Sequence, residues 1–239
     1  MSQDPPTVIV TEDGSRTLSS ARGAAYKSLH GALSEAHAVY LEGSGMAARL
    51  ADGRAGRVLE VGFGAGLNFL VTAAAAQAAS APLEYVALEL APPSADTLRE
   101  LRYAELLAPS TVTDALVAWR AGLGEIVASG RHVFEHGRVR LELFVGDALS
   151  PAWEVGSNWR ADAIYHDAFS PSEQPELWSP EFLARLAGRL AAGGALVSFT
   201  VAGDVRRALE SQGLSVSKVG GPEGGKREVL VALKPAAAT

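Results

Sequence analysis

The chain has 239 residues, of which 48% are hydrophobic and 20% are charged, and its formal net charge at pH 7 is −6. This length and composition are typical of a globular protein with a sizeable core, most simply one domain with an extension. The sequence has no cysteine, which excludes disulfides, thiolate zinc sites and a cysteine nucleophile, and its acidity argues against non-specific coating of nucleic acid.

Residues 1–50 precede the main pattern and are expected to form an N-terminal extension. β-Branched residues from Thr7 to Thr11, followed by a turn signal and by Arg16-Thr17-Leu18, predict a small hairpin. Apolar residues near helical spacing between Tyr26 and Tyr40 then predict a helix. The rest of the chain, residues 51–239, is expected to form the main domain.

Short apolar runs alternate with helical segments throughout the main domain. The predicted strands are residues 58–61, 83–88, 139–145, 161–165, 195–200, 214–219 and 228–233. The predicted helices are residues 67–79, 95–107, 111–129, 180–190 and 204–212. This alternation is typical of an α/β fold with a mainly parallel sheet. The last two strands leave no room for a helix and should form an antiparallel hairpin, an ending typical of the seven-stranded, Rossmann-like methyltransferase sheet.

A glycine-rich turn follows the first strand of the main domain and reads Gly62-Phe63-Gly64-Ala65-Gly66. Glycine has no Cβ, so a ligand can approach the backbone closely, and the helix that follows presents free N–H groups. The dinucleotide fingerprint G-x-G-x-x-G needs glycine at position 67, where Leu67 stands, which disfavours a nicotinamide dehydrogenase. With Glu60 before it, the turn resembles motif I of class I S-adenosylmethionine-dependent methyltransferases.

Acidic residues follow three later strands, and the same methyltransferase pattern gives each of them a role. Ligands of open α/β sheets bind at the carboxyl ends of the strands, where Glu89, Asp147 and Asp167 should gather. The pattern implies that Glu89 holds the ribose hydroxyls, that Asp147 accepts from the adenine amine and that Asp167 faces the methyl group. Acids also cap strand ends in ordinary loops, so the set is more informative than any one of them.

A possible metal motif lies between Gly130 and Gly137. His132, Glu135 and His136 match the order H-x-x-E-H of an inverted zinc-protease signature. That signature requires a helix to bring both histidines to one face, whereas the bracketing glycines indicate a turn. We therefore expect a solvated loop here and no metal site.

Longer stretches resemble one family. Residues 62–70 read G-F-G-A-G-L-N-F-L and resemble the F-G-T-G-L-N-F-L of the bacterial tRNA 5-aminomethyl-2-thiouridine methyltransferases, the MnmC/MnmD type. Residues 167–171 and 175–179 look like that family's D-[GA]-F-[SA]-P and P-[ED]-[LM]-W. The chain departs from the pattern at Lys27, where many members have histidine, and at His166, which replaces an apolar residue. The FAD-dependent oxidase half of some members is missing, so we expect a stand-alone transferase.

The resemblance implies methylation, from S-adenosyl-L-methionine, of the primary amine of 5-aminomethyl(-2-thio)uridine at the tRNA wobble position. The sulfonium provides the leaving group, so catalysis should rest on positioning and on a group that accepts the amine's proton or orients its lone pair. Asp167 is the candidate for that role. Two alternatives stay open: a methyltransferase for a small amine or another modified base, and a non-catalytic S-adenosylmethionine-binding protein.

The expected site residues fall into two groups. The expected cofactor-binding residues are Glu60, Gly62, Phe63, Gly64, Gly66, Asn68, Glu89, Asp147, Ala148 and Asp167. The expected substrate contacts are Tyr26, Phe169, Pro171 and Trp178 around the base, and Arg206, Arg207, Lys226 and Arg227 on tRNA phosphates. Core packing would equally explain Trp178 and Tyr26, and surface ion pairs would explain half of the basic residues.

Partners and location follow from the same interpretation. The expected partners are tRNA and a separate FAD-dependent oxidase acting upstream, and the extension of residues 1–50 is expected to pack near the substrate pocket. The N-terminal residues show no signal-peptide pattern, and the alanine-rich runs are too short to span a bilayer. We therefore expect a cytoplasmic protein.

Overall fold

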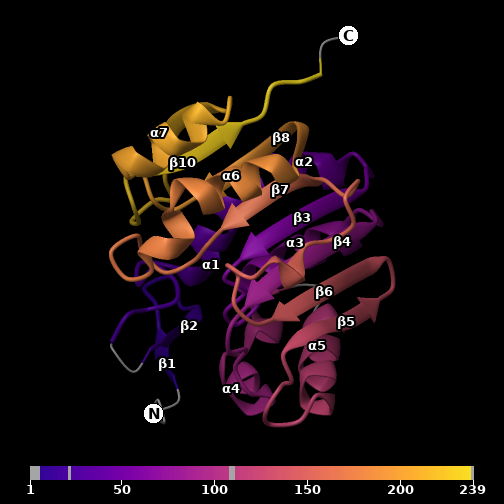
Figure 1. The fold of residues 1–239 in the computed structure, drawn as a ribbon. Coiled ribbons are helices and arrows are strands. Elements are labelled where there is room, and N and C mark those ends of the chain that lie inside the picture. The colour runs from indigo at the N-terminus through magenta and orange to yellow at the C-terminus, as the bar shows by residue number, and fades with distance from the viewer. Residues whose placement is uncertain (1–5, 21–22, 108–110, 238–239) are drawn as a thin grey trace.

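The computed structural model describes residues 6–20, 23–107 and 111–237 (Figure 1). Within these residues, a mixed eight-stranded sheet has the order β5-β6-β4-β3-β7-β8-β10-β9. The parallel strands are β3 (Gly56–Val61), β4 (Leu83–Glu89), β6 (Val139–Val145), β7 (Ala161–His166) and β8 (Leu190–Ser198). The strands β10 (Glu228–Leu233) and β9 (Ser215–Gly220) complete one edge as the expected antiparallel hairpin.

The expected fold class is confirmed, but the expected number of strands is wrong. The eighth strand, β5 (Gly130–His136), lies antiparallel to β6 where a solvated loop was expected. Gly137 has a φ of +59° in the tight turn that joins the two strands, so it marks a hairpin and not the end of a loop. Phe134 explains the pairing, because it is 3% exposed and its ring lies 5.7 Å from that of Trp119 on α5 (Thr111–Gly122).

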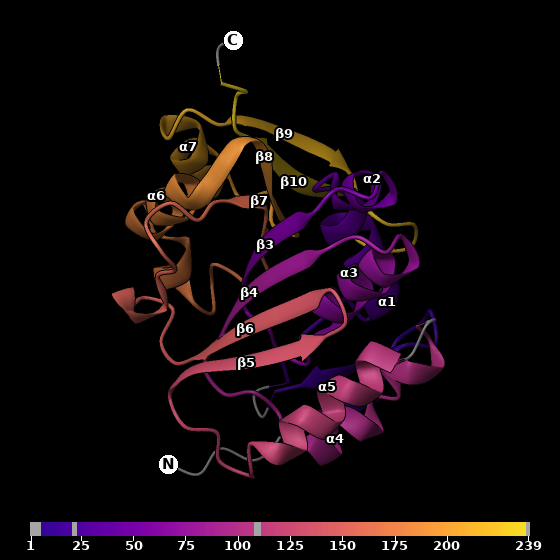
Figure 2. The ribbon, with the colours of Figure 1, turned by 90° about the vertical axis from the view of Figure 1, so that its right-hand side faces the viewer.

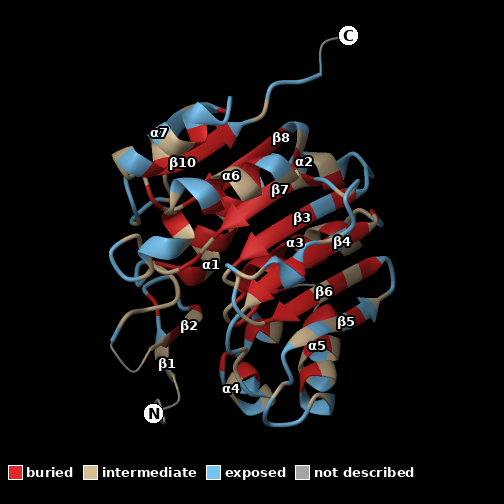
Figure 3. Ribbon diagram, in the orientation of Figure 1, coloured by how far each residue is buried: buried red, intermediate tan, exposed pale blue. Residues whose placement is uncertain are grey.

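Helices cover both faces of the sheet (Figure 2). One face carries α1 (Ala32–Glu35), α2 (Met46–Ala51), α3 (Leu67–Ala78), α4 (Ala95–Glu100) and α5. The other face carries α6 (Pro180–Arg189) and α7 (Gly203–Ser211). Figure 3 shows buried strands between helices whose outer faces are exposed. In the described part of the chain, no helix is long and apolar enough to cross a membrane.

The helix boundaries follow local chemistry. Ser179 caps α6 by accepting from the Phe182 amide, and Pro180 occupies the first helical position, as the sequence predicts. The helix expected over residues 95–107 ends early, because Arg102 adopts a left-handed φ of 52° before the short 3₁₀ turn η2 (Tyr103–Glu105). Two further 3₁₀ turns, η3 (Pro151–Trp153) and η4 (Pro175–Trp178), follow β6 and β7.

The N-terminal residues pack onto the main core. β1 (Thr7–Val10) and β2 (Arg16–Ser19) form an antiparallel hairpin, and α1 continues directly into η1 (Ala36–Glu42), a π-helix. Leu18, Ala36 and Tyr40 belong to the same buried cluster as the residues of α3. The division of the chain at residue 50 stays a prediction.

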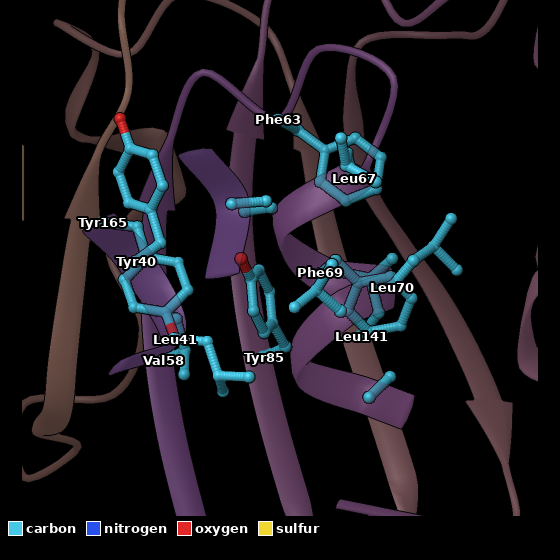
Figure 4. Close-up of a cluster of buried hydrophobic side chains, with 14 of the residues drawn as sticks. Tyr40, Leu41, Val58, Phe63, Leu67, Phe69, Leu70, Tyr85, Leu141 and Tyr165 are labelled. Atoms are coloured by element: carbon cyan, nitrogen blue, oxygen red, sulfur yellow. The ribbon is translucent and has the colours of Figure 1, made fainter. Parts of the chain in front are cut away.

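Aromatic rings connect η1 to the glycine-rich turn (Figure 4). The ring of Tyr40 lies 5.4 Å from Tyr165, which lies 6.1 Å from Tyr85. Tyr85 is 5.1 Å from Phe69 on α3, and Phe69 is 6.1 Å from Phe63 in the turn. The three tyrosine rings and Phe69 are at most 1% exposed, and such packing leaves little rotamer freedom, so the tyrosine hydroxyls are held in place.

Candidate active site

The glycine-rich turn after β3 is tightly packed against the neighbouring loops. Gly62, Gly64 and Gly66 have φ values of 88°, 53° and 78°, a region that side chains disfavour. A Cβ on Gly62 would lie 2.5 Å from the backbone oxygen of Asp167, and one on Gly64 would lie 3.3 Å from the ring of Tyr26. The turn therefore requires glycine at its first position for space as well as for backbone conformation.

A cavity of about 320 Å³ opens at the carboxyl ends of β3, β4, β6 and β7. Its size falls within the range of small-molecule sites. Nine of the residues expected in the site line it: Tyr26, Gly62, Phe63, Gly64, Glu89, Asp147, Ala148, Asp167 and Phe169. Among the described residues, the other expected ones lie outside its lining: Glu60, Gly66, Asn68, Pro171, Trp178, Arg206, Arg207, Lys226 and Arg227.

Two carboxylates line the cavity where β4 and β6 end. Glu89 Oε2 accepts from the Gly64 amide at 2.7 Å, and Oε1 accepts from the Ala91 amide at 2.9 Å. Asp147 Oδ1 accepts from the Leu149 amide at 2.8 Å. Burial raises the pKa of Glu89 above its ordinary value, and the two amide donors oppose that shift. The backbone thus orients both side chains, and their remaining lone pairs are available to a ligand.

Asp167 lines the cavity with a side chain that is 5% exposed, and it accepts from donors in three different segments. Tyr40 donates its hydroxyl to Oδ1 at 2.5 Å, and Asn68 donates its amide to Oδ2 at 2.8 Å. Lys27 also donates to Oδ2 and forms an ion pair with it. Asp167 is thus held as an acceptor in a fixed orientation by the described residues around it.

Glu60 lies beneath Asp167 and outside the cavity. It is 1% exposed and accepts from Asn68 at 2.8 Å and from the Tyr85 hydroxyl at 2.9 Å. Burial, with the Asp167 carboxylate nearby, raises the pKa of Glu60 to about 8. Glu60 and Asn68 were expected to bind the cofactor, and the structure places both in the layer that supports Asp167.

The raised pKa of Glu60 makes stability depend on pH. The folded state keeps the proton that an unfolded glutamic acid loses near pH 4.5, so the stabilisation is complete below that pH and is lost as pH rises to about 8. We expect Glu60→Gln, which resembles the protonated acid, to flatten the decline in the free energy of unfolding between pH 5 and pH 8. Urea unfolding across this range measures the effect, at about 1.4 kcal/mol per unit of pKa shift.

Glu84→Gln is the matched control, since Glu84 is a half-exposed carboxyl of the adjacent strand β4 that pairs with Arg57 at 3.2 Å. Its pH profile should run parallel to that of the unaltered protein. Equal slopes for the Glu60 variant and the unaltered protein would contradict a proton on Glu60.

Two residues of the buried network were missed in the sequence analysis. Glu35 ends α1 and lies 3.6 Å from Lys27 Nζ, and Tyr40 lies five residues further along, in the π-helix. The i→i+5 repeat of a π-helix brings Glu35 and Tyr40 to one side, toward Lys27, whose Nζ lies 4.2 Å from the centre of the Tyr40 ring. The sequence feature that could have indicated a buried role for Glu35 is its place as an acid on the apolar face of the helix expected between Tyr26 and Tyr40.

Aromatic residues form the outer wall of the cavity. The rings of Tyr26 and Phe169 meet edge to face at 5.2 Å. Trp178 supports this wall from behind, because its Nε1 donates to the Phe169 carbonyl at 2.8 Å and its ring stacks on His166 at 4.0 Å. Burial lowers the pKa of His166 to about 4, so its ring is neutral at pH 7 and packs as an aromatic residue.

The four basic residues expected on tRNA lie near the C-terminal end of the chain. Lys226 Nζ lies 4.2 Å from the centre of the Phe199 ring, and Phe199 lines the cavity. Arg207 forms an ion pair with Asp204 within α7. Lys226 is therefore connected to the cavity through Phe199, while Arg207 is occupied by a local surface pair.

His132 and His136 lie on β5, where residues four apart face the same side and Glu135 faces the other. Glu135 pairs with Arg140 at 3.1 Å. Within residues 6–20, 23–107 and 111–237, no group of three or more histidines and acids is arranged to hold a metal ion.

The residues that line the cavity offer the backbone approach and the acceptors that S-adenosylmethionine requires. The positive-φ turn brings the backbone against the ligand space, Glu89 offers acceptors for a ribose diol, and Asp147 offers one for an exocyclic amine. The fold and the site together define a class I S-adenosylmethionine-dependent methyltransferase. A family model described as S-adenosyl-L-methionine-dependent methyltransferase matches residues 116–235, and the chain belongs to this family. S-Adenosyl-L-methionine is its cofactor.

Several curated proteins resemble the chain along most of its length. The tRNA 5-methylaminomethyl-2-thiouridine biosynthesis bifunctional protein MnmC of Paraburkholderia xenovorans is 39% identical over 216 residues, which cover 86% of this chain and 31% of that protein. The protein of the same name from Burkholderia mallei is 36% identical over 95% of this chain and 35% of its own length. The chain thus spans about a third of the length of these relatives.

Solved structures agree with the fold. The crystal structure of MnmC2 from Aquifex aeolicus superposes with a TM-score of 0.76 at 28% identity, over 98% of this chain and 72% of that one. A probable spermidine synthase from Corynebacterium glutamicum, 15% identical, covers all of this chain and 80% of its own with a TM-score of 0.50, which shows the shared fold alone.

Proposed function

We propose that the protein transfers a methyl group from S-adenosyl-L-methionine to the primary amine of 5-aminomethyl(-2-thio)uridine at the tRNA wobble position. The observation that carries the proposal is one cavity that joins the glycine-rich turn and Glu89 to Asp167 and the Tyr26–Phe169 wall. The names of the MnmC relatives, which refer to tRNA 5-methylaminomethyl-2-thiouridine biosynthesis, support this choice of substrate.

Asp167 is proposed to orient the substrate amine. A carboxylate offers about four lone-pair sites, and Tyr40, Lys27 and Asn68 occupy three of them. Among the described residues no donor occupies the fourth, which is proposed to accept one N–H of the amine and so to turn the nitrogen lone pair toward the cofactor. The bound cofactor supplies a methyl group on a sulfonium, an electrophile that carries its own leaving group.

The Tyr26–Phe169 wall is proposed to hold the modified base. A wobble uridine can enter the cavity only if it unstacks from the neighbouring bases of the anticodon. An aromatic wall can replace that lost stacking with its own. Trp178 and Pro171 are proposed to act on this wall from behind, since Trp178 fixes the Phe169 carbonyl. Glu60 and Asn68 are proposed to act on the cofactor indirectly, by fixing the position of Asp167. Gly66 is proposed to act indirectly as well, by setting where α3 begins.

The basic residues are proposed to contact the tRNA backbone. Lys226 is the strongest candidate, because its Nζ lies 4.2 Å from the centre of the Phe199 ring and Phe199 lines the cavity. Arg206 on α7 and Arg227 in the β9–β10 loop are proposed as further contacts, and Arg207 as one that must first leave its ion pair with Asp204. Contacts with phosphates add affinity for tRNA without recognising its nucleotide sequence. A few basic side chains near the cavity can attract the tRNA locally even though the protein as a whole is acidic.

The substrate amine must come from an earlier reaction. A carboxymethylated amine has no primary nitrogen, so an oxidase that removes the carboxymethyl group would have to act first. We propose a separate FAD-dependent oxidase for that step and a cytoplasmic location, where tRNA modification takes place.

The test is direct. The protein is incubated with methyl-labelled S-adenosyl-L-methionine and tRNA from a strain lacking this activity, and the tRNA is then digested to nucleosides. We expect label in 5-methylaminomethyl-2-thiouridine, and none with tRNA whose wobble uridine carries no aminomethyl group or with free small amines. Tight cofactor binding without label in that nucleoside would refute the proposed function.

A further inference from the structure

Among the described residues of the buried network around Asp167, Lys27 alone brings a positive charge into the cavity wall. Its side chain is 8% exposed and lines the cavity. It pairs with Asp167, donates to Asn68 Oδ1 at 2.9 Å and lies 3.6 Å from Glu35 Oε1. Four groups, including the Tyr40 ring, thus hold one ammonium against the carboxylate that faces the ligand.

The reaction needs the substrate amine in its neutral form. A primary alkylammonium has a pKa of about 10, as lysine does, so at pH 7 only about one molecule in a thousand offers a lone pair. A lone buried carboxylate in contact with this group would favour the charged form further. An unpaired Asp167 would therefore bind the substrate in its unreactive state.

The ion pair between Lys27 and Asp167 removes this obstacle. A second cation beside the carboxylate cancels its field at the amine, as a neighbouring cation does for activated lysines. The ammonium then loses its proton to water, and the nitrogen lone pair forms the N–C bond as the C–S bond breaks. The positive charge moves from sulfur to nitrogen, so charge balances, and the product leaves as a secondary ammonium.

Resting on the function proposed above, we propose that Lys27 is a positioning residue that pairs with Asp167 and so selects the substrate amine in its neutral, nucleophilic form. The titratable groups that face this pair are Glu35 of α1, Tyr40 of η1, Glu60 of β3 and Lys226 of the β9–β10 loop. The net effect of the nearby carboxylates is to raise the pKa of Lys27 despite its burial, so Lys27 stays charged.

The test is the pH dependence of single-turnover methylation. Lys27→Met removes the charge and keeps the length of the side chain, whereas Lys27→Arg keeps the charge. We expect Lys27→Met to move the acid limb of the profile upward by about one pH unit or more, with a rate at pH 7 about tenfold lower that recovers at high pH. Lys27→Arg should keep the limb near its original position.

Lys218→Met is the matched control, because Lys218 is an exposed lysine of β9 that pairs with Glu228 at 2.8 Å. It should leave the profile unchanged. A rate for Lys27→Met that falls by the same factor at every pH, or an unmoved acid limb, would overturn the inference. No methylation by the unaltered protein would instead refute the proposed function, and this inference with it.

A second measurement needs no variant. An anticodon stem–loop with a ¹⁵N-labelled aminomethyl group is titrated free and bound to the unaltered protein, and its nitrogen shift reports the amine pKa. The inference requires a bound pKa below the free value. A bound pKa above the free value would overturn it even if Lys27→Met failed to fold.

Discussion

Replacing Asp167 with asparagine is expected to lower kcat by about 10²–10⁴-fold while changing the affinity for S-adenosylmethionine only a few-fold. The substituted amide keeps one acceptor oxygen and must point its NH₂ group either at Tyr40 or at Lys27 and Asn68, which are all donors to Asp167. It also leaves the Lys27 ammonium without its main counter-ion. The orientation of the amine, and with it the alignment of the lone pair, is lost.

Single-turnover rates at saturating cofactor and tRNA measure this effect, and calorimetry measures cofactor affinity. Asp162→Asn is the matched control, since Asp162 lies near the start of β7, the strand that ends next to Asp167, and pairs with Arg49 at 3.1 Å. It should keep kcat within a few-fold. An Asp167→Asn enzyme that kept the full rate would show that this carboxylate plays no part in transfer.

Gly62→Ala is expected to cause the largest loss of stability and cofactor binding in the glycine-rich turn. Its left-handed φ of 88° alone costs about 1–2 kcal/mol for a residue with a Cβ. The added methyl group would also lie 2.5 Å from the backbone carbonyl oxygen of Asp167 and 3.1 Å from the backbone nitrogen of Ala168. The loop after β7 must move, which displaces Asp167 from its donors.

The Gly213→Ala variant separates the cost of the left-handed backbone from the cost of the steric clash. Gly213 has a φ of 78°, and a Cβ there would meet nothing within 4 Å, so it carries the backbone cost alone. We expect urea unfolding to show a loss for Gly62→Ala that exceeds that for Gly213→Ala by about 1–3 kcal/mol. We also expect cofactor affinity at least about tenfold weaker for the first variant only. Equal losses for the two variants would mean that the turn has room for a side chain.

Much of the fold is encoded by local patterns. The buried strands are continuous apolar runs, the start of α6 is marked by Ser179 and Pro180, and the cofactor is indicated by the glycine spacing around Gly62. Each of these depends on residues within a few positions of one another. Side-chain periodicity, capping and φ preferences act over that range, so the sequence alone was sufficient to predict these strands, this helix start and the cofactor.

The hairpin of β5 and β6 shows where local patterns fail. Gly130 and Gly137 looked like the limits of a loop around a histidine pair. Strand pairing was decided by contacts with other elements, chiefly Phe134 against Trp119 of α5 and the ion pair between Arg131 and Glu142 of β6. A short segment adopts the strand conformation when a neighbouring edge and a buried side chain support it.

What the sequence determined was the fold class, the cofactor and the carboxylates of the cavity, because these lie at the ends of strands in a parallel sheet. The tertiary structure alone decided how Asp167 is held. Tyr40 and Lys27 reach it from 127 and 140 residues away in the chain, through a π-helix and a packed N-terminal segment. No periodicity encodes such a contact, since it arises only when distant segments pack and buried charges must find partners.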